Sequence, residues 1–274
     1  MILVILSWIW IGTASFLLGF GAMTGIEKVT GETSFKSVEM YILMGLLCLT
    51  VYSQTFSLVA GVGAAATVGA GMACMVCAVV FRAGIMQYFR NLYPQMRQNK
   101  IHLLLLPLIL FLLLLTVYLT AGHARHYDTD LYHAQAIRWI EDYGVVKGLG
   151  NLHNRFAYNS SFFCLQALFS MKFITGQSLH SVNGFITFLM LSYALGTLSI
   201  WKRECLKTSD FLKIAIFLYF SYRENTLMIS SPGSDIPTLC MVLYISAKWA
   251  ELTEQKNEIY PPDMAFCACL QYGP

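Results

Sequence analysis

Long apolar runs separated by short polar segments dominate the sequence. A helix that crosses a bilayer needs roughly 20 mostly apolar residues, and several runs reach or approach that length. We therefore predict an all-α membrane protein with about seven transmembrane helices. The predicted spans are residues 2 to about 25, two helices within 40–81, and the segments 101–121, 181–201, 214 to about 229 and 236–250.

Small residues mark one face of the second helix in the predicted 40–81 hairpin, whose turn we place at Ser53 and Gln54. Gly61, Ala65 and Gly69 recur at four-residue spacing, which puts them on one side of a helix. Such a ridge lets another helix approach closely. We interpret it as a packing surface.

Basic residues indicate how the chain is oriented in the membrane. Arg82, Arg90, Arg97 and Lys100 follow the third predicted span with no acidic residue among them. The positive-inside rule makes this connector cytoplasmic. The next span then delivers residues 122–180 to the extracytoplasmic side, where the N-terminus also lies.

The apolar segment 159–176 has two interpretations, because Gln166 and Lys172 interrupt it. If it crossed the membrane, the basic cluster Trp201-Lys202-Arg203 after the next span would fall outside, against the charge rule. We therefore favour a juxtamembrane helix that lies on the membrane surface.

The chain divides into three predicted regions. Residues 1–100 form the N-terminal transmembrane helices and the basic connector. Residues 101–250 form a second transmembrane region around the extracytoplasmic loop. Residues 251–274 are a polar tail that starts no further helix, a pattern that would fit a truncated chain.

Composition agrees with a membrane protein. Hydrophobic residues make up 57% of the chain and charged residues 12%, with a mean hydropathy of +0.58. Soluble domains carry about 25% charged residues, so polar surface is too scarce here to cover a water-exposed globule. The net charge of +3 is too small to favour nucleic acid as a partner. The predicted partner is the lipid bilayer.

The extracytoplasmic loop contains a predicted amphipathic helix at 131–143, which Gly144 ends. At 100° per residue, Gln135, Arg138 and Asp142 share its polar face. Such a helix is suited to lie at the membrane interface. Its apolar face carries Tyr132, Ala136, Trp139, Ile140 and Tyr143.

Two carboxylates, Asp128 and Asp130, stand just before that helix. One of them could simply cap the helix N-terminus in a solvated loop. A second carboxylate two residues away, among many basic groups, is what a site for a phosphorylated substrate needs: a general base and cations for the phosphate. The basic residues of this loop are His123, Arg125, His126, His133, Lys147, His153 and Arg155.

A metal site is an alternative use of the same residues. His126, Asp128, Asp130 and His133 are all ligand types, but their spacing fits no standard zinc motif. We assign no metal ligand and no required cofactor, and a bound divalent metal stays an alternative.

Two further positions are candidates. Asp235 opens the last predicted span, where an ionisable group is a functional candidate and also an ordinary helix cap. Arg223 stands beside Glu224 at an outer interface and could form an ion pair or face a phosphate.

The order of these features resembles the GT-C superfamily of membrane glycosyltransferases, which includes protein O-mannosyltransferases and the aminoarabinose transferases of lipid A. Tyr127-Asp128-Thr129-Asp130-Leu131-Tyr132 resembles their acidic motif in the first extracytoplasmic loop. Residues 159–176 and 181–203 resemble the juxtamembrane stretch and the span that follow, and Asp235 resembles a later aspartate. The run from Tyr127 to Ile140 is also similar to an uncharacterised bacterial family of polytopic membrane proteins.

The resemblance implies a multi-pass protein of the bacterial cytoplasmic membrane that transfers a sugar from a polyprenyl-phosphate donor to an envelope acceptor outside the cytoplasm. Asp128 best matches the catalytic base, and Asp130 would assist it. The usual Asp-Glu pair is here Asp-x-Asp, which leaves that division of labour open. The substrate-binding candidates are His126, His133, Arg138, Lys147, Arg155, Arg223 and Asp235.

A different class remains as the alternative, namely a non-enzymatic transporter or a component of envelope polysaccharide assembly. Such a protein should carry ionisable groups or broken helices near the bilayer midplane. The charges of this sequence gather instead beside the predicted outer interface, which favours the transferase.

Overall fold

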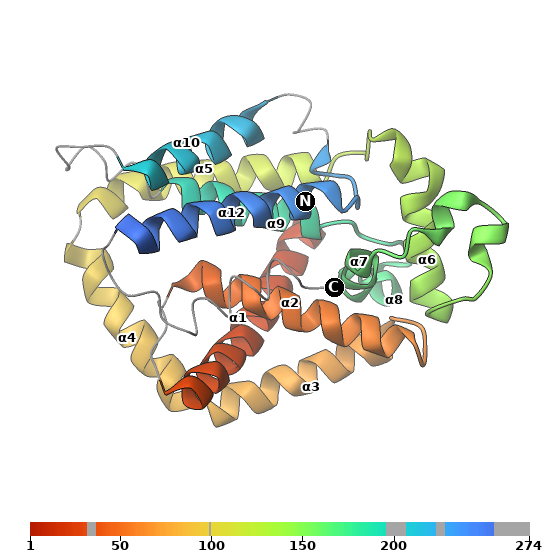
Figure 1. The fold of residues 1–274 in the computed structure, drawn as a ribbon, viewed down its shortest axis with the longest axis horizontal. Helices are drawn as coiled ribbons and strands as arrows, with labels where there is room; N and C mark the ends of the chain where they lie inside the picture. Colours follow the sequence, from red (N-terminus) through yellow and green to blue (C-terminus); the bar gives the residue numbers. More distant parts are fainter. Residues whose placement is uncertain (32–36, 99, 196–206, 223–227, 255–274) are drawn as a thin grey trace.

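The computed structural model describes residues 1–31, 37–98, 100–195, 207–222 and 228–254. Throughout these residues the regular structure is helical, and long helices pack side by side with a group of short ones at one end (Figure 1). The long helices are α1 (Ile2–Thr30), α2 (Val38–Ser57), α3 (Ala64–Val80), α4 (Arg82–Gln98), α5 (Lys100–Thr120), α9 (Val182–Ala194), α10 (Thr208–Ser221) and α12 (Asp235–Glu254). The short elements are the π turn η1 (Thr129–His133), α6 (Ala134–Tyr143), the 3₁₀ turns η2 (Leu149–Asn151) and η3 (Asn154–Ala157), α7 (Ser161–Phe169) and α8 (Lys172–Thr175).

Two helices, α1 and α2, are long and apolar enough to cross a membrane, which indicates membrane association. A third span is reached if α3 and residues 82–94 of α4, bent by 74° at their junction, count as one. Among the described residues the all-helical fold is thus confirmed, with two or three candidate spans in place of the predicted number of about seven. Helices α9 and α10 have 13 and 14 described residues, and the predicted spans 181–201 and 214 to about 229 both extend into residues outside the described part of the chain.

Apart from α4, long helices that follow one another in the chain run in opposite directions, so their ends form two groups (Figure 1). Near the start of α1, the Ser7 hydroxyl lies 2.7 Å from that of Ser181, just before α9. At the end of α2, the Ser57 carbonyl accepts a 2.8 Å hydrogen bond from the Val145 amide. Because residues 122–180 gather on this side, on the right of Figure 1, we call it the loop end.

Backbone contact between α1 and α2 fixes their crossing. A Cβ at Gly19 would lie 1.8 Å from the Tyr41 carbonyl oxygen, and one at Gly45 would lie 1.7 Å from that of Ser15. Only glycine allows these two helices to come so close.

The ridge expected at Gly61, Ala65 and Gly69 is found only in part, because a Cβ at Gly69 would lie 2.3 Å from the Tyr52 hydroxyl of α2 whereas Ala65 is exposed. The buried face of α3 is one residue further on, at Ala66, Ala70 and Cys74. The hairpin turn is also later than predicted, because α2 continues through Ser53 and Gln54 to Ser57, and Gly61 belongs to the turn after it.

Helix α7 corrects the prediction of a helix on the membrane surface at 159–176. With nine residues it is too short to cross a bilayer, as expected. It does not lie on a surface, however, because residues 163–169 are all buried, and α7 packs between α2 and α6. Its continuous apolar sequence reflects burial inside the protein.

The opposite end of the bundle contains a buried group of charges that the sequence pattern does not reveal. The Lys248 ammonium lies 2.9 Å from a carboxylate oxygen of Glu251 and 3.9 Å from one of Glu39. Lys213 also pairs with Glu251 and lies 4.9 Å from the centre of the Tyr193 ring. These pairs join α2, α10 and α12, and we call this side the ion-pair end.

We expect Glu251→Gln to lower the free energy of unfolding by about 3–5 kcal/mol, because it leaves the buried ammonium groups of Lys213 and Lys248 with uncompensated charge. Thermal melting in one detergent would measure the loss. Asp130→Asn is the control, since Asp130 is exposed. Equal melting temperatures for the two variants would contradict a stabilising role for the ion pairs.

Candidate functional site

The acidic motif of the loop end lies on a wide helical turn. The Ala134 amide donates to the Thr129 carbonyl, so η1 is a π turn that leads into α6. Thr129 and His133 are buried, whereas Asp130 points outward and is exposed. The Thr129 hydroxyl lies 2.8 Å from that of Ser231, which ties the turn to the segment before α12. Single π turns are frequent at functional sites.

Asp128 forms an ion pair with Arg155, which comes from η3, 27 residues later. The guanidinium also lies over the ring of Tyr132, 5.4 Å from its centre, and Tyr132 contacts the ring of Tyr158. The Asp128 and Arg155 side chains are 28% and 37% exposed, so both are accessible to a ligand. An ion pair with this much exposure adds little to the free energy of folding. Stabilisation of the fold therefore does not explain why the two side chains are placed together.

Two imidazoles extend the site toward the bundle. The rings of His126 and His133 are stacked with centres 6.1 Å apart, and His133 also packs against Phe163. Burial lowers the pKa of His133, and His126 lowers it further, while Asp128 and Asp235 act in the opposite direction. His133 is therefore held neutral at physiological pH.

The segment before α12 completes this arrangement. The Asn183 amide donates to the carbonyls of Ser231 at 2.5 Å and Gly233 at 2.8 Å. A Cβ at position 233 would lie 3.0 Å from the His133 ring, so glycine allows the close approach. Asp235 and His126 line the same small cavity next to this segment. We call Asp128, Tyr132, Arg155, His126, His133 and Asp235 the loop-end cluster.

Asp130 belongs to a different place. It lines a cavity of about 570 Å³ together with Arg138, Lys172 and His180, and none of the loop-end cluster lines that cavity. The structure thus separates the two aspartates that the motif places side by side. Burial lowers the pKa of His180 to about 4, and His133 contributes to the shift.

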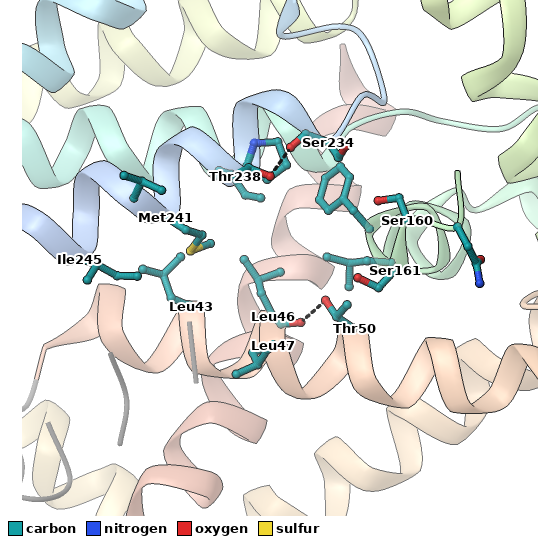
Figure 2. Close-up of a pocket in the computed structure, with 16 residues that line it drawn as sticks. Leu43, Leu46, Leu47, Thr50, Ser160, Ser161, Ser234, Thr238, Met241 and Ile245 are labelled. Carbon is teal, nitrogen blue, oxygen red and sulfur yellow. Dashed lines mark hydrogen bonds between the residues drawn. The ribbon is translucent and has the colours of Figure 1, made fainter. Parts of the chain in front are cut away.

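A largely apolar groove of about 460 Å³ runs between α2, α7 and α12 (Figure 2). Leu43, Leu46, Met241 and Ile245 form its apolar part. The hydroxyls of Ser160, Ser161, Ser234 and Thr238 form its polar end.

This polar end adjoins the loop-end cluster. Ser234 directly precedes Asp235, and Ser160 follows Tyr158, whose ring contacts Tyr132, by two residues. The polar end of the groove is therefore built from segments that also carry Asp235 and Tyr158.

The remaining predicted residues have mixed positions. Lys147 is exposed in the turn after α6, and its side chain forms no ion pair or hydrogen bond with the residues that the structure describes. Arg223, Glu224 and the boundary cluster at 201–203 lie outside the described residues. Within the described part of the chain, no group of three or more His, Cys, Asp or Glu side chains could hold a metal ion.

Sequence reasoning missed several residues that build the site. Asn183 and Ser231 position the segment before α12. Glu141 of α6 is another missed residue, because it is buried although α6 has a polar face. The Ser-Ser-Pro-Gly-Ser run at 230–234 signals a turn, but nothing in it reveals Asn183 as the partner. The sequence predicts Arg155 as a substrate-binding residue, but it does not predict that Arg155 pairs with Asp128.

The chain matches a family described as Domain of unknown function (DUF8201) over residues 1–271. It belongs to the DUF8201 family. The DUF8201 match includes every residue of the loop-end cluster and of the groove. No curated protein and no solved structure matched the chain significantly.

We expect His180 to make stability pH-dependent. Its folded pKa of about 4 lies below the unperturbed value of about 6.5, so the unfolded chain binds the proton first as pH falls, and stability is lost. Between pH 7.5 and pH 5 the loss should be about 2 kcal/mol. Chemical denaturation of the wild type and of His180→Gln at both pH values measures it.

The control for that experiment is His153→Gln, which removes an exposed imidazole from the same loop end. It should leave the pH dependence as in the wild type. An unchanged dependence in His180→Gln would show that the His180 imidazole is not held neutral by burial.

Proposed function

We propose that this protein is a membrane-embedded, GT-C-like glycosyltransferase that transfers a sugar from a polyprenyl-phosphate donor to an envelope acceptor on the extracytoplasmic side. One observation carries the proposal: an apolar groove has a polar end lined by Ser234 and Ser160, which are near neighbours in sequence of Asp235 and Tyr158, and the Asp128–Arg155 pair next to Tyr158 and Tyr132 is accessible. A ligand with a long apolar tail and an anionic head fits that combination. The likeness of the Asp128 motif to that superfamily adds to it.

The donor would bind with its tail and head in different surroundings. The prenyl chain would lie along the groove against Leu46 and Met241, where burial of apolar surface favours it. The phosphate would meet the Arg155 guanidinium, whose planar fork suits phosphate oxygens. Tyr132 and Tyr158 offer ring faces beside that position.

Asp128 would act as the general base. Arg155 neutralises its charge in the structure, so arrival of the donor phosphate would draw the guanidinium away and release the carboxylate. The carboxylate accepts the proton of an acceptor hydroxyl, and the hydroxyl oxygen forms a bond to the anomeric carbon. The bond from that carbon to the phosphate oxygen breaks, and polyprenyl phosphate leaves with the electron pair. Attack opposite the leaving group inverts the anomeric centre.

The proposal places the loop end outside a bacterial cytoplasmic membrane and the ion-pair end inside. The alternating helix directions are compatible with seven crossings, with the shorter helices accommodated where the bilayer thins or other helices cover their ends. Helix α4, which carries Arg82 and Arg90, begins at the end of α3 away from the loop end, as the positive-inside rule requires.

The buried charges Glu39, Lys213, Lys248 and Glu251 favour a transporter as the second candidate, since ionisable groups within a membrane bundle mark ion pathways. Their positions argue for the first candidate. Glu39 is the second residue of α2, and Glu251 lies in the last turn of α12, so the cluster is at the helix ends and not at their middle.

We expect Asp128→Asn to reduce transfer by about 10²–10⁴-fold, the usual contribution of a general base. Membranes that contain the full chain would be supplied with radiolabelled polyprenyl-phosphate mannose, glucose or aminoarabinose, and labelled envelope product would be counted. Asp142→Asn is the matched control, because Asp142 is an exposed carboxylate of the same loop that pairs with Lys172.

Full transfer by Asp128→Asn would remove the proposed base. A wild-type chain that transfers none of the three sugars would contradict the proposed activity itself. Protein amounts in the membrane, measured by immunoblot, ensure that a loss of transfer is not a loss of protein.

A further inference from the structure

The cavity that contains Asp130 is a second site of different character. Asp130, Ala134 and Arg138 recur every four residues along one face of η1 and α6 and form one wall. Lys172 and His180 belong to the opposite part of the lining, with the turn at 176–178 between them in sequence. Its volume of about 570 Å³ is in the range of small-molecule sites.

The lining of this cavity is almost free of apolar side chains. Ala134 is the single apolar side chain among the lining residues, and none of them carries a benzenoid or indole ring. A lipid tail or an aromatic ligand would find no partner surface here. The cavity therefore differs in chemistry from the groove between α2 and α12, and the two share no lining residue.

Part of the cavity is fixed by hydrogen bonds and ion pairs. The Lys172 ammonium lies 2.5 Å from Asp142 and 3.5 Å from Glu141, so its charge is already compensated. The Ser178 hydroxyl donates to the buried Glu141 carboxylate at 2.8 Å. These contacts hold the α8 side of the cavity against α6, which is the preorganisation that a binding site needs.

Other polar groups of the lining are available to a ligand. Among the described residues, no hydrogen bond or ion pair is recorded for the side chains of Asp130, Gln135, Arg138 and Gln177. A solvated surface would also show free groups, but here they line one cavity. Arg138 offers a forked cation for an anionic group. The two amides and the Asp130 carboxylate offer donors and acceptors for several hydroxyls.

We propose that this cavity binds a monosaccharide unit that bears one anionic group, a carboxylate or a phosphate. Arg138 binds the anion, and Gln135, Gln177 and Asp130 bind the hydroxyls. Glu141 and Asp142 already neutralise the charge of Lys172, which leaves Arg138 as the cation for a ligand. The cavity therefore accommodates one anionic group rather than a multiply phosphorylated ligand. This binding does not depend on transfer at Asp128.

Calorimetric titration of the purified full chain in detergent tests the proposal. The probes are glucuronate, glucose 6-phosphate, glucose and inorganic phosphate. We expect saturable binding of at least one acidic sugar, with glucose and inorganic phosphate each at least about tenfold weaker, because each lacks one half of the recognised chemistry. The stronger acidic sugar identifies the anion as carboxylate or phosphate.

Arg138→Gln should weaken binding of that sugar by at least about tenfold, the usual effect of losing a hydrogen-bonded charge. Arg125→Gln is the matched control, since Arg125 is exposed in the same loop and does not line the cavity. Arg138 is itself exposed, so unchanged thermal melting should show that the variant folds.

Three results would overturn the proposal: no saturable binding of an acidic sugar to the wild type, equal binding of glucose or inorganic phosphate, or undiminished binding to Arg138→Gln. The outcome is separate from the transfer assay. If Asp128→Asn loses transfer but the wild type binds no acidic sugar, the proposed function stands and this site is rejected. If the wild type binds an acidic sugar through Arg138 but Asp128→Asn keeps full transfer, this site stands and the proposed base is rejected.

Discussion

Backbone amides and carbonyls must find partners inside the chain wherever apolar surroundings exclude water, and this constraint governs the whole structure. Hydrophobic residues make up 57% of the chain, and its described part satisfies the hydrogen bonds of the backbone by forming helices. Helices satisfy their own interior groups but leave polar groups at their ends. The alternating directions of successive helices collect those ends on two sides, so the charged and hydrogen-bonding residues concentrate at the loop end and the ion-pair end. The candidate site is a consequence of this segregation.

Much of the helical fold follows from local sequence patterns, and its errors arise where tertiary contacts decide. Apolar runs located α1 and α5 closely, and the 3.6-residue period of the amphipathic segment located α6. The apolar sequence of α7 could not distinguish burial against α2 and α6 from contact with lipid, because both surroundings favour the same side chains. The charges at the ion-pair end were likewise invisible, since Glu39 and Lys248 are far apart in sequence and meet only when α2 and α12 pack.

The sequence names most residues of the candidate site, but it does not reveal which of them contact one another. The density of ionisable residues drew attention to the loop before α6, and the structure brings several of them together there. The pairing of Asp128 with Arg155 and the placement of Asp130 in another cavity depend on the π turn, which shifts the direction of successive side chains and has no sequence signature of its own. The DUF8201 family carries no described function, so the functional argument rests on the groove, the cluster and the resemblance of the motif.

Transfer at Asp128 requires that the loop end faces away from the cytoplasm, where a lipid-linked sugar could reach it. Alkaline phosphatase, which is active only outside the cytoplasm, can be fused after Lys100, Lys147 and Lys207, with a cytoplasm-active fluorescent reporter at the same positions. We expect phosphatase activity after Lys147 and fluorescence after Lys100 and Lys207. Fluorescence without phosphatase activity after Lys147 would put the loop-end cluster in the cytosol and rule out transfer outside the cytoplasm.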